Sequence, residues 1–151
     1  MTLPVLLVFA LVYLGMIAGG LPYFQLDRTG IALLFIPSGI AKLTGFAGAT
    51  AYVAAAGLPA PALGAAVAIV VEVGFGLALL AGWQARRAAL VMALFTLAAA
   101  FCFHQFWAAP PDQKFIQNIQ FFKNMAIAGG LLFVFAFGPG AYSLDARSRK
   151  A

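Results

Sequence analysis

The residues of this chain that could do chemistry are few, and they stand inside or beside apolar stretches. Glu72 interrupts a long aliphatic run, and Lys42, His104, Lys123 and Asn124 interrupt three others. A charge inside hydrocarbon costs at least about 2.5–3.5 kcal/mol on insertion scales, so a retained charge needs a partner or a function. A carboxylate, two ammonium groups and an imidazole could together hold a polar ligand or move a proton.

Two interpretations of this cluster remain open, and they are not exclusive. In the structural one, Glu72 pairs with Lys123 or Lys42 and the pair fixes the register of the helices, because an unpaired buried charge is expensive. In the functional one, the same side chains and His104 form a proton-handling or quinone-headgroup site. His104 by itself is more typical of a capping residue at the membrane boundary.

Composition sets the class of protein. Of the 151 residues, 64% are hydrophobic and 9% are charged, and the mean hydropathy is +1.01. Soluble domains carry roughly 25% charged residues, so this chain could not cover a water-facing surface. Disorder is also excluded, since it requires low hydrophobicity. The chain is therefore expected to be an all-α integral membrane protein.

The rare residue types exclude several kinds of site. With one histidine and one cysteine, Cys102, the chain can form neither an internal disulfide nor a metal cluster nor a bis-histidine haem site. Any redox cofactor is then expected to be organic or to come from a partner. A quinone is the candidate, and the sequence does not identify it. The net charge is +5, but the cations are scattered, so no nucleic-acid partner is expected.

Five apolar segments are compared with the roughly 20 residues that a helix needs to cross a bilayer. They are residues 3–24, 29–44, 60–82, 87–107 and a last one from between 115 and 121 to 137. The first is favoured as a retained helix over a cleaved signal peptide. Residues 45–58 are expected to form a short amphipathic helix at the membrane surface. We accordingly expect three parts: an additional N-terminal segment (1–28), a helical bundle (29–145) and a basic tail (146–151).

The distribution of cations predicts the orientation. One side of the membrane receives Arg28, Arg86, Arg87, Arg147, Arg149 and Lys150, and the other receives Lys42, Lys114 and Lys123. The positive-inside rule places the first group, and the C-terminus, in the cytoplasm. In this topology the five polar residues gather in the outer half of the bundle.

Small residues accompany the polar ones and indicate close helix packing. They are Gly39, Gly74, Gly76, Gly129 and Gly130. Glycines let helix backbones approach each other in a membrane and leave long polar side chains facing inward.

From about Leu33 to its end, residues 33–151, the chain resembles the DoxX family of small bacterial membrane proteins. The matching segments are Phe35-Ile36-Pro37-Ser38-Gly39-Ile40-Ala41-Lys42, Gly57-Leu58-Pro59, Glu72-Val73-Gly74, Gly76-Leu77, Gly82 with Arg86, His104-Gln105-Phe106-Trp107, Lys123-Asn124 and Gly138-Pro139-Gly140-Ala141-Tyr142-Ser143-Leu144-Asp145. The resemblance implies a four-helix bundle in the bacterial cytoplasmic (inner) membrane. It also implies a link to quinone- or thiol-handling oxidoreductase complexes, although most members have no established activity.

The N-terminal part departs from that pattern. Residues 11–34, with Tyr13-Leu14-Gly15-Met16, weakly resemble the opening of arsenite and sodium–proton antiporter-like permeases. A fusion near Leu34 and an unrelated additional helix remain equal alternatives.

The first functional hypothesis is a redox-linked accessory subunit without a catalytic centre of its own. Glu72 and Lys123 would share or relay a proton, while Lys42 and His104 would donate hydrogen bonds to a quinone oxygen. Two alternatives stay open. One is a noncatalytic scaffold that recruits soluble or membrane redox enzymes through residues 84–87 and 147–150. The other is a small-molecule transporter, which would require a homo-oligomer.

Overall fold

The computed structural model describes residues 23–148, with side chains from Arg28 onward. Most of the additional N-terminal segment expected at residues 1–28 therefore lies outside the described residues, and only residues 23–28 of it are described. Arg149 and Lys150 also lie outside the described residues. The elements in chain order are α2 (Tyr23–Thr44), α3 (Phe46–Ala55), α4 (Pro61–Ile69), the π-helical turn η1 (Val70–Phe75), α5 (Gly76–Ala81), α6 (Ala85–Phe103), α7 (Pro111–Phe137) and α8 (Leu144–Ser148). Between residues 23 and 148 the chain forms helices joined by short loops and no strand, as expected for an all-α membrane protein.

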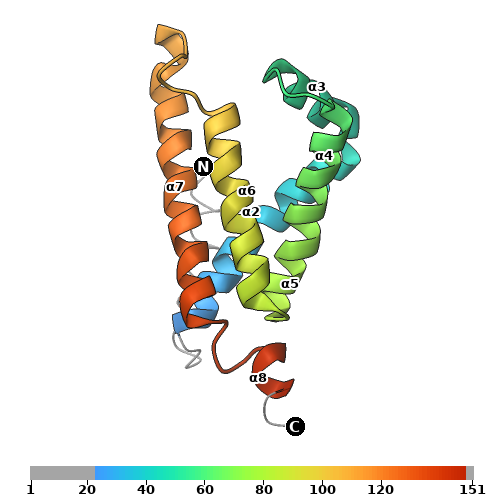
Figure 1. The fold of residues 1–151 in the computed structure, drawn as a ribbon, viewed down its shortest axis with the longest axis vertical. Helices are drawn as coiled ribbons and strands as arrows, with labels where there is room; N and C mark the ends of the chain where they lie inside the picture. Colours follow the sequence, from blue (N-terminus) through green and yellow to red (C-terminus); the bar gives the residue numbers. More distant parts are fainter. Residues whose placement is uncertain (1–22, 149–151) are drawn as a thin grey trace, which may run out of the picture.

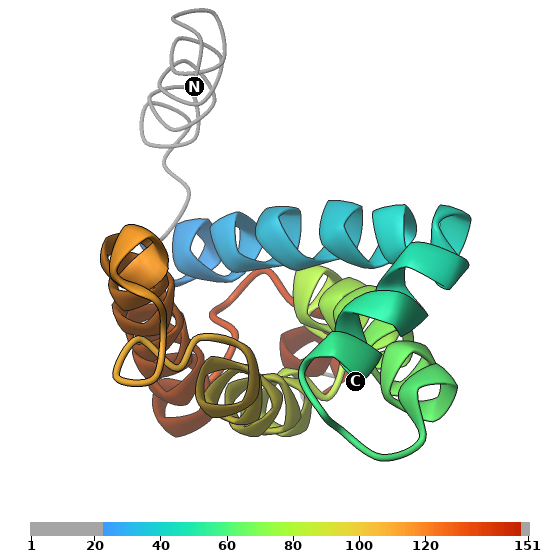
Figure 2. The same ribbon diagram turned by 90° about the horizontal axis from the view of Figure 1, so that it is seen from above.

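The long helices form a bundle with one closed and one spread end. Helices α6 and α7 lie side by side, and α4, η1 and α5 form one continuous rod on the other side of α6 (Figure 1). Helix α2 runs obliquely across η1 and α5 and also touches α7 (Figure 2). The rods converge near α5 and α8, whereas α3 and the start of α7 lie apart at the opposite end (Figure 1).

Three rods are long and apolar enough to cross a membrane: Pro61–Ala81, Ala85–Phe103 and Pro111–Phe137. A fourth span results if Arg28–Thr44 and Phe46–Ala55 are taken together, although they bend by 101° between them. Helix α3 lies within residues 45–58, where a short helix was predicted. By length and composition, the described bundle therefore has three candidate spans, or four if α2 and α3 together form one.

Three predicted helix boundaries were wrong. Helix α2 begins at Tyr23 and not at residue 29. The last span begins at Pro111, before the predicted 115–121, because a proline in the first turn of a helix gives up no hydrogen bond. The preceding span ends at Phe103 and not at residue 107, because His104 leaves the helical conformation at φ −125° and ψ 50°.

The core lies where the rods converge. Leu79, Met92 and Leu131 are fully buried there and join α5, α6 and α7. Helix α6 buries alanines on the same face, at Ala85, Ala88, Ala89 and Ala93. Small side chains on the central helix let its neighbours approach closely.

The C-terminal segment folds back onto this closed end. The carboxylate of Asp145 accepts hydrogen bonds from the backbone N–H groups of Gln84 (2.8 Å) and Ala85 (2.9 Å), and so caps the start of α6. The buried guanidinium of Arg28 donates to the backbone oxygen of Tyr142 at 3.1 Å. Residues 146–148, expected to open a tail, belong to α8. The cations at Arg28, Arg86 and Arg87 thus share one end, as their grouping predicted.

The five glycines differ in what surrounds them. A Cβ at Gly39 would lie 2.6 Å from Val73 Cγ2 and 2.9 Å from Glu72 Cβ, so α2 and η1 touch there. A Cβ at Gly76 would meet Ile36 at 3.0 Å, and one at Gly130 would meet Ile31 at 3.3 Å. Contrary to the expectation from the sequence, Gly74 and Gly129 face open space within the described chain.

This difference predicts the effect of adding one methyl group. Gly39→Ala is expected to lower the stability of the detergent-purified protein by about 1–3 kcal/mol, because the new Cβ overlaps η1. Gly74→Ala, in the same rod as Glu72, is the matched control and is expected to be neutral or about 1 kcal/mol stabilising through helix propensity. Thermal unfolding measures both, and equal effects of the two substitutions would contradict the close contact at Gly39.

The cap on α6 gives a second prediction. Asp145→Ala removes the acceptor of two backbone N–H groups and is expected to lower the unfolding free energy by about 1–2 kcal/mol. Asp112→Ala is the control, because Asp112 is exposed in the first turn of α7 and has no side-chain hydrogen bond to another described residue. Thermal unfolding of both variants checks this, and a loss at Asp112 as large as that at Asp145 would refute the capping role.

Candidate functional site

An ion pair lies in the spread half of the bundle. The Nζ atom of Lys42 lies 2.8 Å from Oε2 of Glu72 and donates a second hydrogen bond, of 2.7 Å, to Oγ of Ser38. Glu72 is buried, with 6% of its surface exposed, whereas the Lys42 side chain keeps about a third of its surface exposed. The structure therefore selects Lys42 from the two partners that the sequence left open for Glu72.

Local backbone features bring the two charges together. Glu72 lies in the π-helical turn η1, and such turns are rare and frequently occur at functional sites. Gly39 faces the backbone of η1, so α2 comes close enough for Lys42, one turn further along, to reach the carboxylate. Ser38 precedes Lys42 by four residues, which places both side chains on one face of α2.

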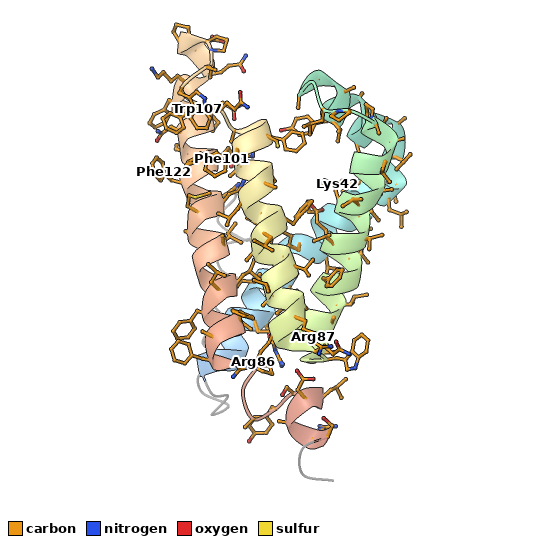
Figure 3. All side chains as sticks on the ribbon, in the orientation of Figure 1. Lys42, Arg86, Arg87, Phe101, Trp107 and Phe122 are labelled. Atoms are coloured by element: carbon orange, nitrogen blue, oxygen red, sulfur yellow. The ribbon has the colours of Figure 1, made fainter. Side chains whose placement is uncertain are left out.

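A cavity of about 480 Å³ adjoins this pair; we call it the ion-pair cavity. Its polar lining comes from several elements and includes all five residues singled out in the sequence: Lys42, Glu72, His104, Lys123 and Asn124. Its apolar walls come mainly from α2, α4 and α6. Figure 3 shows Lys42 in the half of the bundle that carries α3, while Arg86 and Arg87 lie at the opposite end.

The remaining predicted residues line the ion-pair cavity without touching the ion pair. Nδ1 of His104 lies 2.9 Å from Oε1 of Gln117 on α7. Lys123 is exposed and donates to Oε1 of Gln120, one turn earlier on its own helix. Asn124 is half-buried. A molecule inside the cavity could therefore meet all five polar side chains, but the chain itself joins only two of them.

Sequence reasoning missed further residues of this cavity: Ser38, Tyr52, Thr96, Cys102 and Phe103. Ser38 could have been found from its spacing of four residues before Lys42. Thr96 is buried and donates to the backbone oxygen of Met92 at 2.7 Å, a contact that gives no signal in the sequence. Tyr52 was placed on the surface helix, and nothing in its own segment indicates contact with α6.

A group of aromatic rings joins the end of α6, the loop that follows it and α7. Phe121 packs edge-to-face against Phe101 and Trp107, with ring centroids 5.2 and 5.6 Å apart. Phe106 and Phe122 complete this group, and Figure 3 shows Trp107 and Phe122 at the outer side of α7. Such rings are typical of a membrane–water boundary.

Comparison with known proteins identifies the family. The family model described as DoxX matches residues 24–105, which is more than half of the chain. The chain belongs to the DoxX family. The match begins before Leu33, so the part of the permease-like segment from residue 24 onward falls inside the DoxX region, and no family boundary lies at Leu34.

The chain is similar to several known proteins, including the following three. The chain is 38% identical to the inner membrane protein YphA of Escherichia coli over 80% of its own length and 86% of that protein. It is 42% identical to the inner membrane protein YqjF of the same organism, over 78% and 85% of the two lengths. A Surfeit locus protein 4 homologue of Schizosaccharomyces pombe is 31% identical over 45% of this DoxX chain and 23% of that protein. No solved structure matches the chain at a significant level.

The geometry predicts strong coupling between Lys42 and Glu72. Lys42→Met leaves a buried carboxylate without its ion-pair partner, so it is expected to cost more stability than the double variant Lys42→Met/Glu72→Met. A double-mutant cycle is expected to give a coupling free energy of about 1–3 kcal/mol. The matched cycle of Lys123→Met with Glu72→Met should give a value near zero, and a larger coupling there would contradict the pairing.

Proposed function

We propose that this DoxX protein binds the polar ring of a quinone at Lys42 and Glu72 and serves as a redox-linked accessory subunit in the membrane. The observation that carries the proposal is the ion-pair cavity itself, in which the buried carboxylate of Glu72 and its half-buried partner Lys42 line a cavity of about 480 Å³. Ligand sites typically have volumes of about 300–1,000 Å³, apolar walls and a few convergent polar groups. The cavity has this combination of size and lining.

The ion pair retains unused hydrogen-bonding capacity. A lysine ammonium has three N–H donors, and Lys42 uses two of them on Ser38 and Glu72. The third is free for a carbonyl oxygen of a ligand. Oε1 of Glu72 makes no hydrogen bond to the described residues, so it can accept a proton, or a hydrogen bond that a hydroxyl group of the reduced ligand donates.

The other polar side chains would act around the ring. Asn124 can donate a hydrogen bond to a second ligand oxygen from the far wall of the cavity. Nδ1–H of His104 donates to Oε1 of Gln117, so the free Nε2 of the neutral ring can accept a hydrogen bond from a hydroxyl group of the reduced ligand. Lys123 would have to break its hydrogen bond to Gln120 before it could exchange a proton with Glu72. In this proposal, Lys42 is therefore the first partner of Glu72 in proton transfer. The chain supplies binding, orientation and proton transfer, and the electrons would come from a partner enzyme.

The relatives and the charge distribution support a location and an orientation. Because YphA and YqjF are named inner membrane proteins, we place this chain in the bacterial cytoplasmic membrane. The end that carries Arg28, Arg86 and Arg87 would then face the cytoplasm by the positive-inside rule. The ion-pair cavity would lie toward the outer face.

Extraction of bound lipids tests the proposal. Detergent-purified protein is extracted with solvent, and quinone is quantified by chromatography in the wild type, Glu72→Gln and Lys42→Met. We expect near one quinone per chain in the wild type and at least a tenfold loss in both variants, because each removes a polar contact to the ring. Lys114→Met, an exposed position outside the cavity, is the control and should retain quinone.

Absence of quinone above the lipid background from folded wild-type protein would overturn the proposal. The scaffold hypothesis would then gain weight, since it has support of its own at the opposite end. There a hollow of about 340 Å³ is lined by Gln84, Arg86, Arg87, Pro139, Asp145 and Ser148. Its two arginines could receive an acidic segment of a redox enzyme, since the carboxylate of Asp145 is already engaged by the backbone of Gln84 and Ala85.

A further inference from the structure

A second cavity adjoins the ion-pair cavity at the end of the bundle that carries α3. It has a volume of about 440 Å³, and we call it the α3-end vestibule. Its lining includes Tyr52, Cys102, Phe103, Gln105, Gln113 and Gln117. Tyr52, Cys102 and Phe103 line both cavities, so these three residues form the boundary between them.

The boundary contains a stacked pair of aromatic rings. The rings of Tyr52 and Phe103 lie nearly parallel, at 13°, with centroids 5.1 Å apart. Tyr52 comes from α3, which packs on α2 and α4, and Phe103 is the last residue of α6. The stack therefore joins two elements that lie on different sides of the bundle.

The two sides of this boundary differ in chemistry. The vestibule has three glutamine amides among its lining residues, Gln105, Gln113 and Gln117. The ion-pair cavity is mostly apolar around Lys42 and Glu72. One polar contact joins residues of the two linings: Gln117 lines the vestibule, and its Oε1 lies 2.9 Å from Nδ1 of His104, which lines the ion-pair cavity.

We propose that the α3-end vestibule is the aqueous entry site of the ion-pair cavity, for water and small polar solutes, and that the Tyr52–Phe103 stack controls passage between the two. The inference rests on the proposed function for its biological meaning, since a redox ligand at Lys42 and Glu72 must exchange protons with water. Amide side chains suit such a vestibule because they form hydrogen bonds with water and carry no charge. Movement of α3 away from α6 would separate the rings and open the passage.

Thiol labelling tests the entrance without any quinone. Cys102, shared by both cavities, is one reporter, and Thr96→Cys in a Cys102→Ala background is the other, because Thr96 is buried and lines only the ion-pair cavity. Protein in lipid nanodiscs is treated with a charged thiosulfonate reagent that does not cross lipid. We expect Cys102 to react at least tenfold faster than Thr96→Cys while the rings are stacked.

Removing one ring should open the passage. Tyr52→Ala is expected to accelerate labelling of Thr96→Cys at least tenfold and to change labelling of Cys102 much less. Tyr52→Phe, which keeps the ring and loses only the hydroxyl, is the matched control and should leave the slow rate unchanged. If Thr96→Cys misfolds, Ala99→Cys replaces it at a position that lines only the ion-pair cavity, and Phe103→Leu tests the stack from the side of α6.

Equal labelling rates of Thr96→Cys with and without the Tyr52 ring would overturn the gate. A Cys102 that does not react with the charged reagent would overturn the aqueous entrance. Ring-dependent labelling in a protein that carries no quinone would leave the entrance in place and overturn the proposed function. Bound quinone together with ring-independent labelling would overturn the gate and leave the proposed function in place.

Discussion

The ion pair between Lys42 and Glu72 is the constraint on which the rest of the bundle depends. A carboxylate with 6% of its surface exposed, inside an apolar rod, requires a compensating charge close by. That charge is available only because Gly39 lets α2 contact the backbone of η1. The oblique path of α2 across η1 and α5, seen in Figure 2, is the arrangement that satisfies this requirement. The ion-pair cavity results from the same geometry.

The two ends of the bundle are stabilised in different ways. At the closed end, fully buried Leu79, Met92 and Leu131 pack together, and Asp145 and Arg28 hold the C-terminal segment by hydrogen bonds to backbone groups. At the other end, α3 and α6 meet through stacked rings, between the two cavities. Regions with few buried apolar contacts open most readily. Ligand exchange is therefore expected at the α3 end, with the closed end acting as a fixed base.

Membership of the DoxX family and the geometry of the cavity contribute different kinds of information. The family identifies a membrane protein similar to YphA and YqjF, whose names state a location and no reaction. Chemistry has to come from the site, because related folds carry different functions. Here the site offers a spare N–H on Lys42, a spare carboxylate oxygen on Glu72 and apolar walls. These features suit a ring with polar oxygens better than a metal ion or a large polar substrate.

The sequence by itself determined the class of the protein, most of the helices and the polar residues of the cavity. Composition is sufficient for this, because every charge in hydrocarbon is conspicuous against its apolar neighbours. Only the tertiary structure decided which lysine pairs with Glu72, since Lys42 and Lys123 both interrupt apolar segments and their distances from Glu72 depend on how the helices pack. It also decided that Asp145 caps α6 across the chain, that Tyr52 reaches Phe103, and that Gly74 faces open space while Gly39 meets a helix. Each of these depends on the direction in which a helix face points toward a distant segment, and that direction is set by packing and not by local residue type.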